Sequence, residues 1–277
     1  MATSSARCTA CPRNLPTVAA TPIEYLAKGT HRATSREWVP EAPVALEFNG
    51  LSYAVMMATP AGLEDFATGF ALAEGLAQTA DDISDIAIAQ VEQGWIVRAT
   101  LAGLGIEQLT ARVRSRVAES SCGLCGIENL AEVARALPPV AAHSAIEPIA
   151  IFAALAALRD QQPLARLTGA SHAAAFVTPE GAIVCLREDV GRHNAMDKLV
   201  GAMARAGRVL TPGFILSTAR CSFEIVEKAV RGGAATLVTV SLPTSLAVER
   251  ATAAGLSLWV LARDDSVILV HDASSRT

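Results

Sequence analysis

The chain has 277 residues, of which 51% are hydrophobic and 4% aromatic, and its formal net charge is -4, from 23 basic and 27 acidic residues. This length suits one large domain or two modest ones, and the acidic balance argues against a nucleic-acid surface. No stretch reaches the ~18 apolar residues of a membrane span. Because residues 1–22 lack the apolar core of a secretion signal, we expect a flexible tail on a soluble, cytoplasmic protein without membrane partners.

The first half of the chain predicts strands around a single helix. Two apolar runs flank Asn49-Gly50, a pair that tolerates positive φ and therefore indicates a hairpin. Apolar residues then recur at helical spacing in GLEDFATGFALAEGLA, residues 62–77, and a second strand pair follows about Gln93-Gly94. Residues 23–118 are therefore expected to form a smaller β-rich N-terminal subdomain.

The second half, residues 145–277, alternates strands with helices. A long helix should start near residue 146 and end at Pro163 and Gly169. The expected strands are residues 173–178, 182–187, 214–217, 237–240 and 258–261, and the expected helices are residues 192–206, 223–231 and 246–254. This alternation predicts an α/β (α+β) subdomain with a mixed sheet and helical crossovers, in which ligands bind beyond the carboxyl ends of strands.

Between the two halves, residues 119–144 hold a Cys-x-x-Cys pair, Cys122 and Cys125, in a segment rich in serine and glycine. The pair could be half of a zinc site with Cys8 and Cys11, a redox pair, two inert loop cysteines or a nucleophilic sulfur site. The small residues favour exposed thiols on a mobile loop. A helix starting near Glu128 would stabilise a thiolate at its amino end, which favours the nucleophile.

Three polar segments follow strands in the second half. Residues 186–201, LREDVGRHNAMDKLVG, indicate either a solvated helix start capped by Asp189 or an anion-binding turn with Arg192 and His193 as donors. Arg220 lies in a second such segment. His172 occupies the place of a deaminase zinc ligand, but Ala174 stands where the catalytic glutamate would be, which excludes deaminase chemistry. Cys185 and Cys221 have no partner in the sequence pattern, and both are expected to be buried, small, apolar side chains.

Five stretches together resemble the formate dehydrogenase accessory sulfurtransferases, the FdhD family. They are SSCGLCG, SHAAAF, REDVGRHNAMDKLVG, STARCSFEIVEKA and SLPTSLAVERATAAGLSLWVLAR. The resemblance implies a homodimer with a cytidine-deaminase-like core and a sulfurtransferase activity. A cysteine desulfurase would supply persulfide sulfur to Cys122, assisted by Cys125. The sulfur would pass to the bis-molybdopterin guanine dinucleotide cofactor before its insertion into formate dehydrogenase.

The resemblance also implies a cofactor-binding segment late in the chain. The matching residues are Leu261, Ala262, Arg263, Asp264, Asp265 and Ser266. Only Arg263 keeps the family's usual residue type, and the acidic pair disfavours phosphate, so backbone amides are expected to supply part of the contact. With His172, Asp189, Arg192, His193 and Arg220, this segment is expected to bind the cofactor or GDP as its mimic, without a metal of its own. The alternatives are a non-catalytic cofactor chaperone and a zinc-stabilised binding module.

Overall fold

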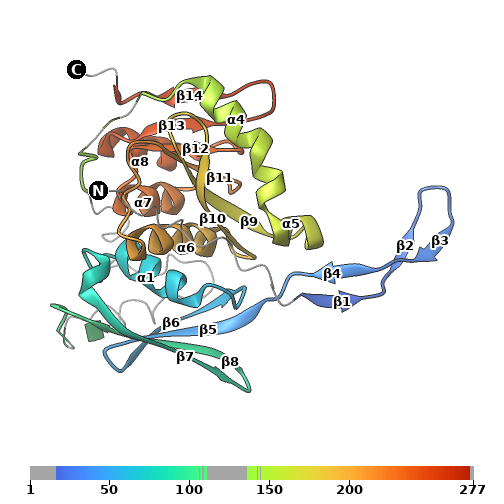
Figure 1. Cartoon of the computed structure of the whole chain (residues 1–277), viewed down its shortest axis with the longest axis horizontal. Coiled ribbons are helices and arrows are strands. Elements are labelled where there is room, and N and C mark those ends of the chain that lie inside the picture. Colours follow the sequence, from blue (N-terminus) through green and yellow to red (C-terminus); the bar gives the residue numbers. More distant parts are fainter. Residues whose placement is uncertain are drawn as a thin grey trace, which may run out of the picture.

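The computed structural model describes residues 17–105, 107, 109–110, 136–141, 143 and 145–274. These residues form a protruding β-arm, a four-stranded sheet and a six-stranded sheet covered by helices (Figure 1). In these ranges no helix is long and apolar enough to cross a membrane. The mixed α/β architecture expected from the sequence is confirmed.

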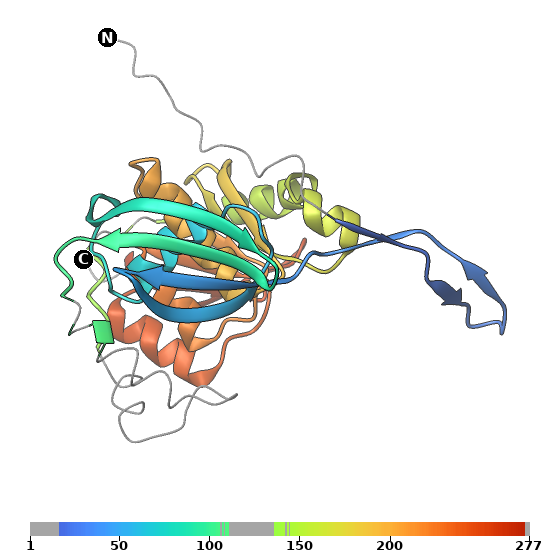
Figure 2. The same cartoon turned by 90° about the horizontal axis from the view of Figure 1, so that it is seen from below.

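The β-arm consists of two short antiparallel ribbons and projects from the body (Figure 2). In the first ribbon β1 (Val18–Ala20) pairs with β4 (Arg36–Trp38), and in the second β2 (Ile23–Tyr25) pairs with β3 (His31–Ala33). β1 lies inside the segment that was expected to be a tail, so ordered structure begins earlier than the sequence predicts. At the base of the arm, β4 contacts α5 (Pro163–Thr168).

The four-stranded sheet has the order β6-β5-β8-β7 and forms from the two hairpins that the sequence predicts. Its strands are β5 (Ala42–Phe48), β6 (Leu51–Ala58), β7 (Ile83–Val91) and β8 (Gly94–Leu101). Asn49 and Gly50 have φ values of 50° and 80°, which is why this pair forms the first turn. A short 3-10 turn, Ala80–Asp82, leads into β7.

The six-stranded sheet has the order β10-β9-β11-β12-β13-β14. Its strands are β9 (His172–Val177), β10 (Ile183–Asp189), β11 (Phe214–Ser217), β12 (Thr236–Thr239), β13 (Ser257–Val260) and β14 (Ile268–His271). β11, β12 and β13 are parallel, whereas the other pairs are antiparallel. The expected mixed sheet with helical crossovers is therefore present.

Helices cover both faces of this sheet. On one face lies α4 (Pro148–Leu158), and on the other lie α6 (Arg192–Arg205), α7 (Phe223–Arg231) and α8 (Ser245–Ala254). Along β9, Ala173, Ala175 and Val177 join the core under α4, while Ala174 and Phe176 join the core under α6. This alternation is the two-residue period of a strand buried on both faces.

The long helix expected before Pro163 is interrupted. After α4 the chain makes a 3-10 turn, Arg159–Gln161, and α5 then starts with Pro163 at its first position. Proline has no backbone N–H and is accommodated at the first helical position, so Pro163 begins a new helix instead of ending the old one.

The two sheets share one hydrophobic core, and α1 (Leu63–Ala73) joins them by packing against α6 (Figure 1). Two glycines face each other in this helix pair. A Cβ at Gly69 would lie 1.7 Å from the carbonyl oxygen of Asp197, and one at Gly201 would lie 1.9 Å from that of Asp65. Only glycine allows this approach, so the predicted subdomains form a single packed unit.

Candidate functional site

The carboxyl edge of the six-stranded sheet gathers the polar residues singled out in the sequence. Asp189 at the end of β10 pairs with His172 at the start of β9, and Ala174 of β9 pairs with Ser217 at the end of β11. Because β11, β12 and β13 are parallel, the segments after them meet at this same edge. The fold therefore brings His172, Arg192, Arg220 and residues 261–266 to one side of the sheet.

A basic cluster, formed by His172, Arg192, His193 and Arg220, lies at one end of this edge. Arg192 and His193 are the first two residues of α6, and Arg220 comes shortly before α7. Burial lowers the pKa of His172, and the nearby positive charges of Arg192 and Arg220 lower it further. His172 thus lies in an electropositive environment, to which the amino ends of two helices add partial positive charge.

His193 is uncharged at neutral pH. Burial lowers its pKa to about 4, and the charges of Arg192 and Lys228 act in the same direction, against the carboxylate of Glu224. Its Nε2 atom lies 4.0 Å from a Glu224 carboxylate oxygen. This distance is too long for a hydrogen bond.

Three polar atoms of this region are buried without a hydrogen-bond partner in the described part of the chain. They are Arg192 Nε, His193 Nε2 and Ser222 Oγ. A buried unsatisfied polar group costs about 1–3 kcal/mol, so the protein gains from a ligand that pairs with such groups. Ser222 occupies the cap position of α7, but its side chain makes no cap hydrogen bond.

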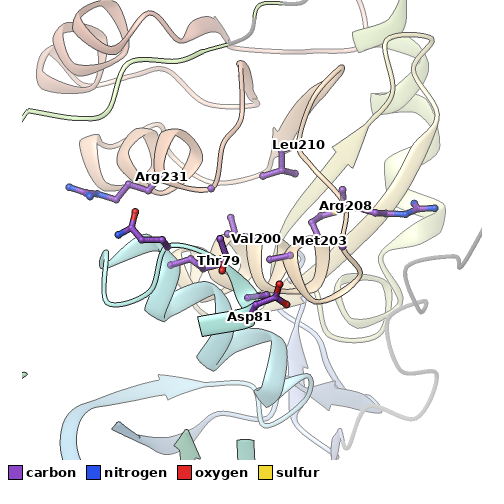
Figure 3. A pocket seen from close by; sticks show the side chains of 13 residues that line it. Thr79, Asp81, Val200, Met203, Arg208, Leu210 and Arg231 are labelled. Carbon is purple, nitrogen blue, oxygen red and sulfur yellow. The ribbon is translucent and has the colours of Figure 1, made fainter. Parts of the chain in front are cut away.

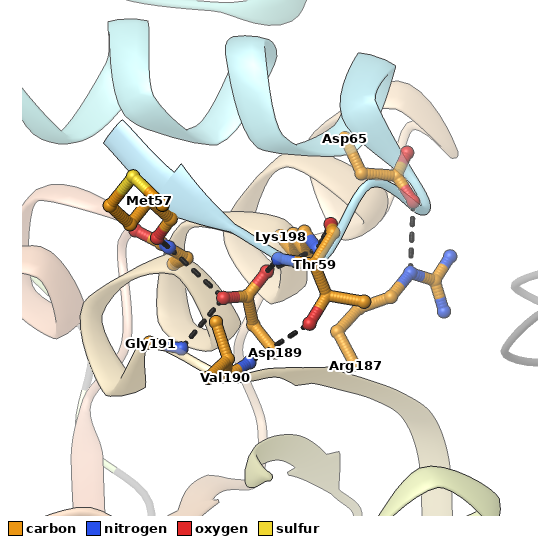
Figure 4. Close-up of polar contacts among 9 residues, drawn as sticks. Met57, Thr59, Asp65, Arg187, Asp189, Val190, Gly191 and Lys198 are labelled. Atoms are coloured by element: carbon orange, nitrogen blue, oxygen red, sulfur yellow. Dashed lines mark hydrogen bonds and ion pairs between the residues drawn. The ribbon is translucent and has the colours of Figure 1, made fainter. Parts of the chain in front are cut away.

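Asp189 points into the protein and not towards a ligand. The side chain is fully buried, and its carboxylate accepts hydrogen bonds from the backbone amides of Thr59 (3.1 Å) and Gly191 (2.7 Å) and from Asn194 (3.0 Å) (Figure 4). Lys198, which is also buried, forms an ion pair with it. With four donors, Asp189 has no free position for the direct cofactor contact expected from the sequence, and it instead positions the turn that presents Arg192.

Arg187 and Asp197 are also paired inside the protein, so the expectation that the charges of this helix start face water is wrong for these residues. Asp65 of α1 accepts from Arg187 at 2.9 Å and from Arg205 at 2.6 Å. Lys228 of α7 donates to Asp197 at 2.7 Å, and burial raises the pKa of Asp197 to about 6. The first two pairs join β10 and α6 to α1, and the third joins α6 to α7.

Sequence reasoning missed the partners in these pairs. Thr59, whose hydroxyl accepts from Val190 N at 3.1 Å, and Asp65 are separated from their partners by more than a hundred residues in the chain. No local pattern marks such contacts.

Residues 261–266 form a turn after β13 whose backbone is largely engaged. The amides of Leu261 and Ala262 donate to Ser241 O (3.3 Å) and Thr239 O (3.1 Å), and the Arg263 amide donates to Ser266 O (2.8 Å). The Arg263 guanidinium donates to the carbonyl of Val240. These three amides are therefore not free for a cofactor, whereas the side chains from residue 263 to residue 266 are exposed.

Cys122 and Cys125, together with Cys8 and Cys11, lie outside the described residues. Cys221 is buried and free, as expected, and burial raises the pKa of its thiol to about 11. It is therefore protonated at neutral pH and is no candidate nucleophile. Within the described ranges no three histidine, cysteine or acidic side chains gather as metal ligands.

Two cavities lie away from the basic cluster. One, of about 270 Å³, opens where the carboxyl ends of α6 and α7 approach the Ala80–Asp82 turn, and it contains none of the predicted site residues (Figure 3). The other, of about 480 Å³, lies beside Asp264. Small-molecule sites usually measure about 300–1,000 Å³, so only the second falls in this range.

Known proteins are similar to this chain over most of its length. The sulfur carrier protein FdhD of Variovorax paradoxus is 46% identical over 239 residues, covering 86% of each chain, and that of Cupriavidus necator is 43% identical over 88% of this chain and 84% of the relative. A crystal structure of a candidate formate dehydrogenase accessory protein from Desulfotalea psychrophila superimposes with a TM-score of 0.72 at 20% identity, over 93% of this chain and 98% of that one. The model of the FdhD/NarQ family matches residues 39–276, and the chain belongs to this family.

Proposed function

We propose that this protein is a sulfurtransferase needed for formate dehydrogenase activity. It takes persulfide sulfur from a cysteine desulfurase and passes it to the bis-molybdopterin guanine dinucleotide cofactor, which then enters formate dehydrogenase. The observation that carries the proposal is the 46% identity, over most of the chain, to a relative named as a sulfur carrier protein. The basic cluster supports it, because the proposed client carries phosphate groups.

Cys122 is the proposed sulfur carrier. Its thiolate attacks the outer sulfur of the desulfurase persulfide, the donor S–S bond breaks, and the desulfurase cysteine leaves as a thiolate. The transferred sulfur stays on Cys122 as a persulfide. Cys125 assists, either by shielding this persulfide or by attacking the Cys122 sulfur, which breaks the persulfide S–S bond, forms a Cys122–Cys125 disulfide and releases the transferred sulfur as sulfide.

The basic cluster is the proposed phosphate site. Arg192 and Arg220 supply positive charge, and His172 and His193 supply uncharged ring nitrogens in partly buried positions. Charge-assisted hydrogen bonds from arginine are the strong contacts to phosphate. Asp189 acts indirectly in this scheme, because it holds the turn before Arg192. Residues 261–266 are the proposed further contact.

A maturation assay tests the two cysteines separately. Formate dehydrogenase should stay inactive when the only copy of this protein carries Cys122→Ala, whereas Cys125→Ala should retain part of the activity. Cys221→Ala is the matched control, because this thiol is buried and protonated. Normal maturation by both the Cys122→Ala and the Cys125→Ala variant would favour the non-catalytic cofactor chaperone.

An analysis of the zinc content distinguishes the sulfur-carrier proposal from the other alternative, a zinc-stabilised binding module. The purified protein should contain no stoichiometric zinc under the sulfur-carrier proposal. One zinc ion per chain that is lost in the Cys122→Ala variant would instead identify a zinc-stabilised binding module.

A further inference from the structure

The outward face of α4 is apolar although it is exposed. The 11 residues of this helix, PIAIFAALAAL, include no charged or polar side chain. One face is buried against the sheet, and the opposite face consists of Ile149, Phe152, Ala153 and Ala156, whose spacing of three and four residues places them on a single stripe. Ile149 is 73% exposed. Because a helix that is apolar all round is normally covered on every side, this stripe indicates a binding partner.

The stripe is complementary to itself. Its large side chains, Ile149 and Phe152, lie towards the amino end of the helix, and its small side chains, Ala153 and Ala156, lie towards the carboxyl end. When a second copy of α4 lies antiparallel across a twofold axis between residues 152 and 153, Ile149 meets Ala156 of the second copy and Phe152 meets its Ala153. Each large side chain then packs against a small one, and the same contacts recur on both sides of the axis, as an isologous interface requires.

A cavity beside Ala156 fits the same arrangement. This cavity, of about 480 Å³, lies at the carboxyl end of α4, and three of its apolar lining residues are Phe152, Leu155 and Ala156. The antiparallel register places Ile149 of the second copy against Ala156, at the wall of this cavity. The second copy therefore supplies an apolar side chain where the surface of the first is hollow.

The two ends of α4 also favour antiparallel packing. Glu147 directly precedes the helix and Arg159 directly follows it. In this register Glu147 of one copy lies within about one residue rise, ~1.5 Å along the axis, of Arg159 of the other, and Asp160 lies beyond the end of the paired helices. The opposed helix dipoles attract each other as well, whereas parallel packing would bring like charges together.

We infer that α4 is a surface through which two copies of this chain associate, packed antiparallel about a twofold axis between residues 152 and 153. The inference goes beyond the proposed sulfur transfer and does not depend on it. It assigns both the surface and the register of the contact, so it predicts which residues of the two copies meet.

Neighbouring surfaces extend this contact. A helix of 11 residues is about 16 Å long, which is too short to bury by itself the ~800 Å² per copy of a stable interface. The next helix, α5, adds Leu167, which is 55% exposed. α5 also contacts β4 at the base of the β-arm, so α4, α5 and the arm lie on one side of the molecule (Figure 1, Figure 2). One twofold axis can therefore use all three.

Sedimentation equilibrium of the full-length protein tests this surface. Ala153→Arg places a long, charged side chain at the proposed axis and should raise the dissociation constant of the dimer at least about tenfold. Ala253→Arg is the matched control, because Ala253 is also an exposed helical alanine but lies on α8, on the opposite face of the sheet. This control should associate as the wild type does.

Disulfide cross-linking provides a measurement that a folding defect cannot imitate. Helix axes about 8 Å apart bring the two copies of residue 153 within the Cα–Cα distance of about 4.4–6.8 Å that a disulfide needs. With the oxidant diamide, Ala153→Cys should therefore give a covalent dimer whose peptide map joins residue 153 of one copy to residue 153 of the other. Ala253→Cys should give no such product.

The inference is overturned by a dissociation constant that Ala153→Arg leaves at the wild-type value, or by an Ala153→Cys variant that gives no cross-link at residue 153. A wild-type protein that stays monomeric at micromolar concentration overturns it as well. Sulfur loading of Cys122 is measured separately, so this inference and the proposed function can fail independently.

Discussion

At the residue scale, two adjacent acidic side chains hold two different parts of the candidate site. Glu188 accepts from the amides of Leu164 (2.9 Å) and Ala165 (2.8 Å), which are among the first amides of α5, and from the Ser171 hydroxyl (2.9 Å). A carboxylate at this position satisfies amides that a helix leaves unpaired. Asp189 instead fixes the turn before α6, so neither residue is available to a ligand.

The buried Asp189–Lys198 pair predicts a large stability effect. Asp189→Ala leaves the Lys198 ammonium buried without its counter-ion and should lower the free energy of unfolding by about 3–5 kcal/mol. Asp265→Ala, at an exposed position, should change it by less than about 0.5 kcal/mol. Urea unfolding of the two variants checks this, and equal midpoints would contradict the assigned burial of the pair.

His193 predicts a pH dependence. Its pKa is about 4 in the folded protein, below its ordinary value of 6.5, because of burial and the facing charges of Arg192, Lys228 and Arg220, which outweigh Glu224. The neutral ring therefore contributes stability that is complete above about pH 6.5 and is lost as the pH falls towards 4. We expect the difference in unfolding free energy between the wild type and His193→Asn to be smaller at about pH 5 than at about pH 7. A difference that is the same at both pH values would contradict this.

At the element scale, the local sequence pattern predicted the strands and helices well wherever the spacing of the hydrophobic residues and the residues at the turns indicated the same element. The Asn49-Gly50 hairpin, β11 and α7 formed at or near the expected residues. The break between α4 and α5 was not predicted, because Pro163 is compatible with either a helix end or a helix start. The short ribbons of the arm were not predicted either, since three-residue strands carry little periodicity.

The close packing of α1 on α6 depends on Gly69 and Gly201, which no helix propensity explains. Gly201→Ala places a methyl group against the backbone of α1 and should destabilise the protein by at least about 1–3 kcal/mol, despite the higher helix propensity of alanine. Gly105→Ala, where a Cβ meets no atom within 4 Å, is the control and should be nearly neutral. Thermal unfolding compares the two, and an unchanged melting temperature for Gly201→Ala would disprove the contact.

At the scale of the whole molecule, the sheet edge made part of the site predictable. The rule that ligands bind beyond the carboxyl ends of parallel strands correctly grouped the segments holding Arg192, Arg220 and Arg263. The sequence could not show that Asp189 is enclosed by Thr59 and Lys198, because this depends on how the four-stranded sheet and α1 pack against α6. Burial, and not residue type, separates the more exposed charges at this edge from the structural ones.

The β-arm is the surface on which we expect the proposed homodimer to form. Its large apolar side chains are exposed, namely Val18, Ile23, Tyr25, Leu26 and Trp38. Isolated two-stranded ribbons are marginally stable in water, so a permanent partner such as a second copy would stabilise the arm. In sedimentation experiments Tyr25→Lys should weaken the dimer, whereas Val209→Lys on the body should not. Equal association of both variants would exclude the arm.

The central claim is that this protein carries sulfur on Cys122. Intact-protein mass spectrometry after incubation with a cysteine desulfurase and cysteine tests it most directly, with peptide mapping to locate the modification. We expect the mass of one additional sulfur atom on the wild type, mapped to the peptide that contains Cys122, removed by a reducing agent and absent in Cys122→Ala. A wild-type protein that gains no sulfur, or a Cys122→Ala variant that gains it to the same extent, would contradict the proposed sulfur carrier.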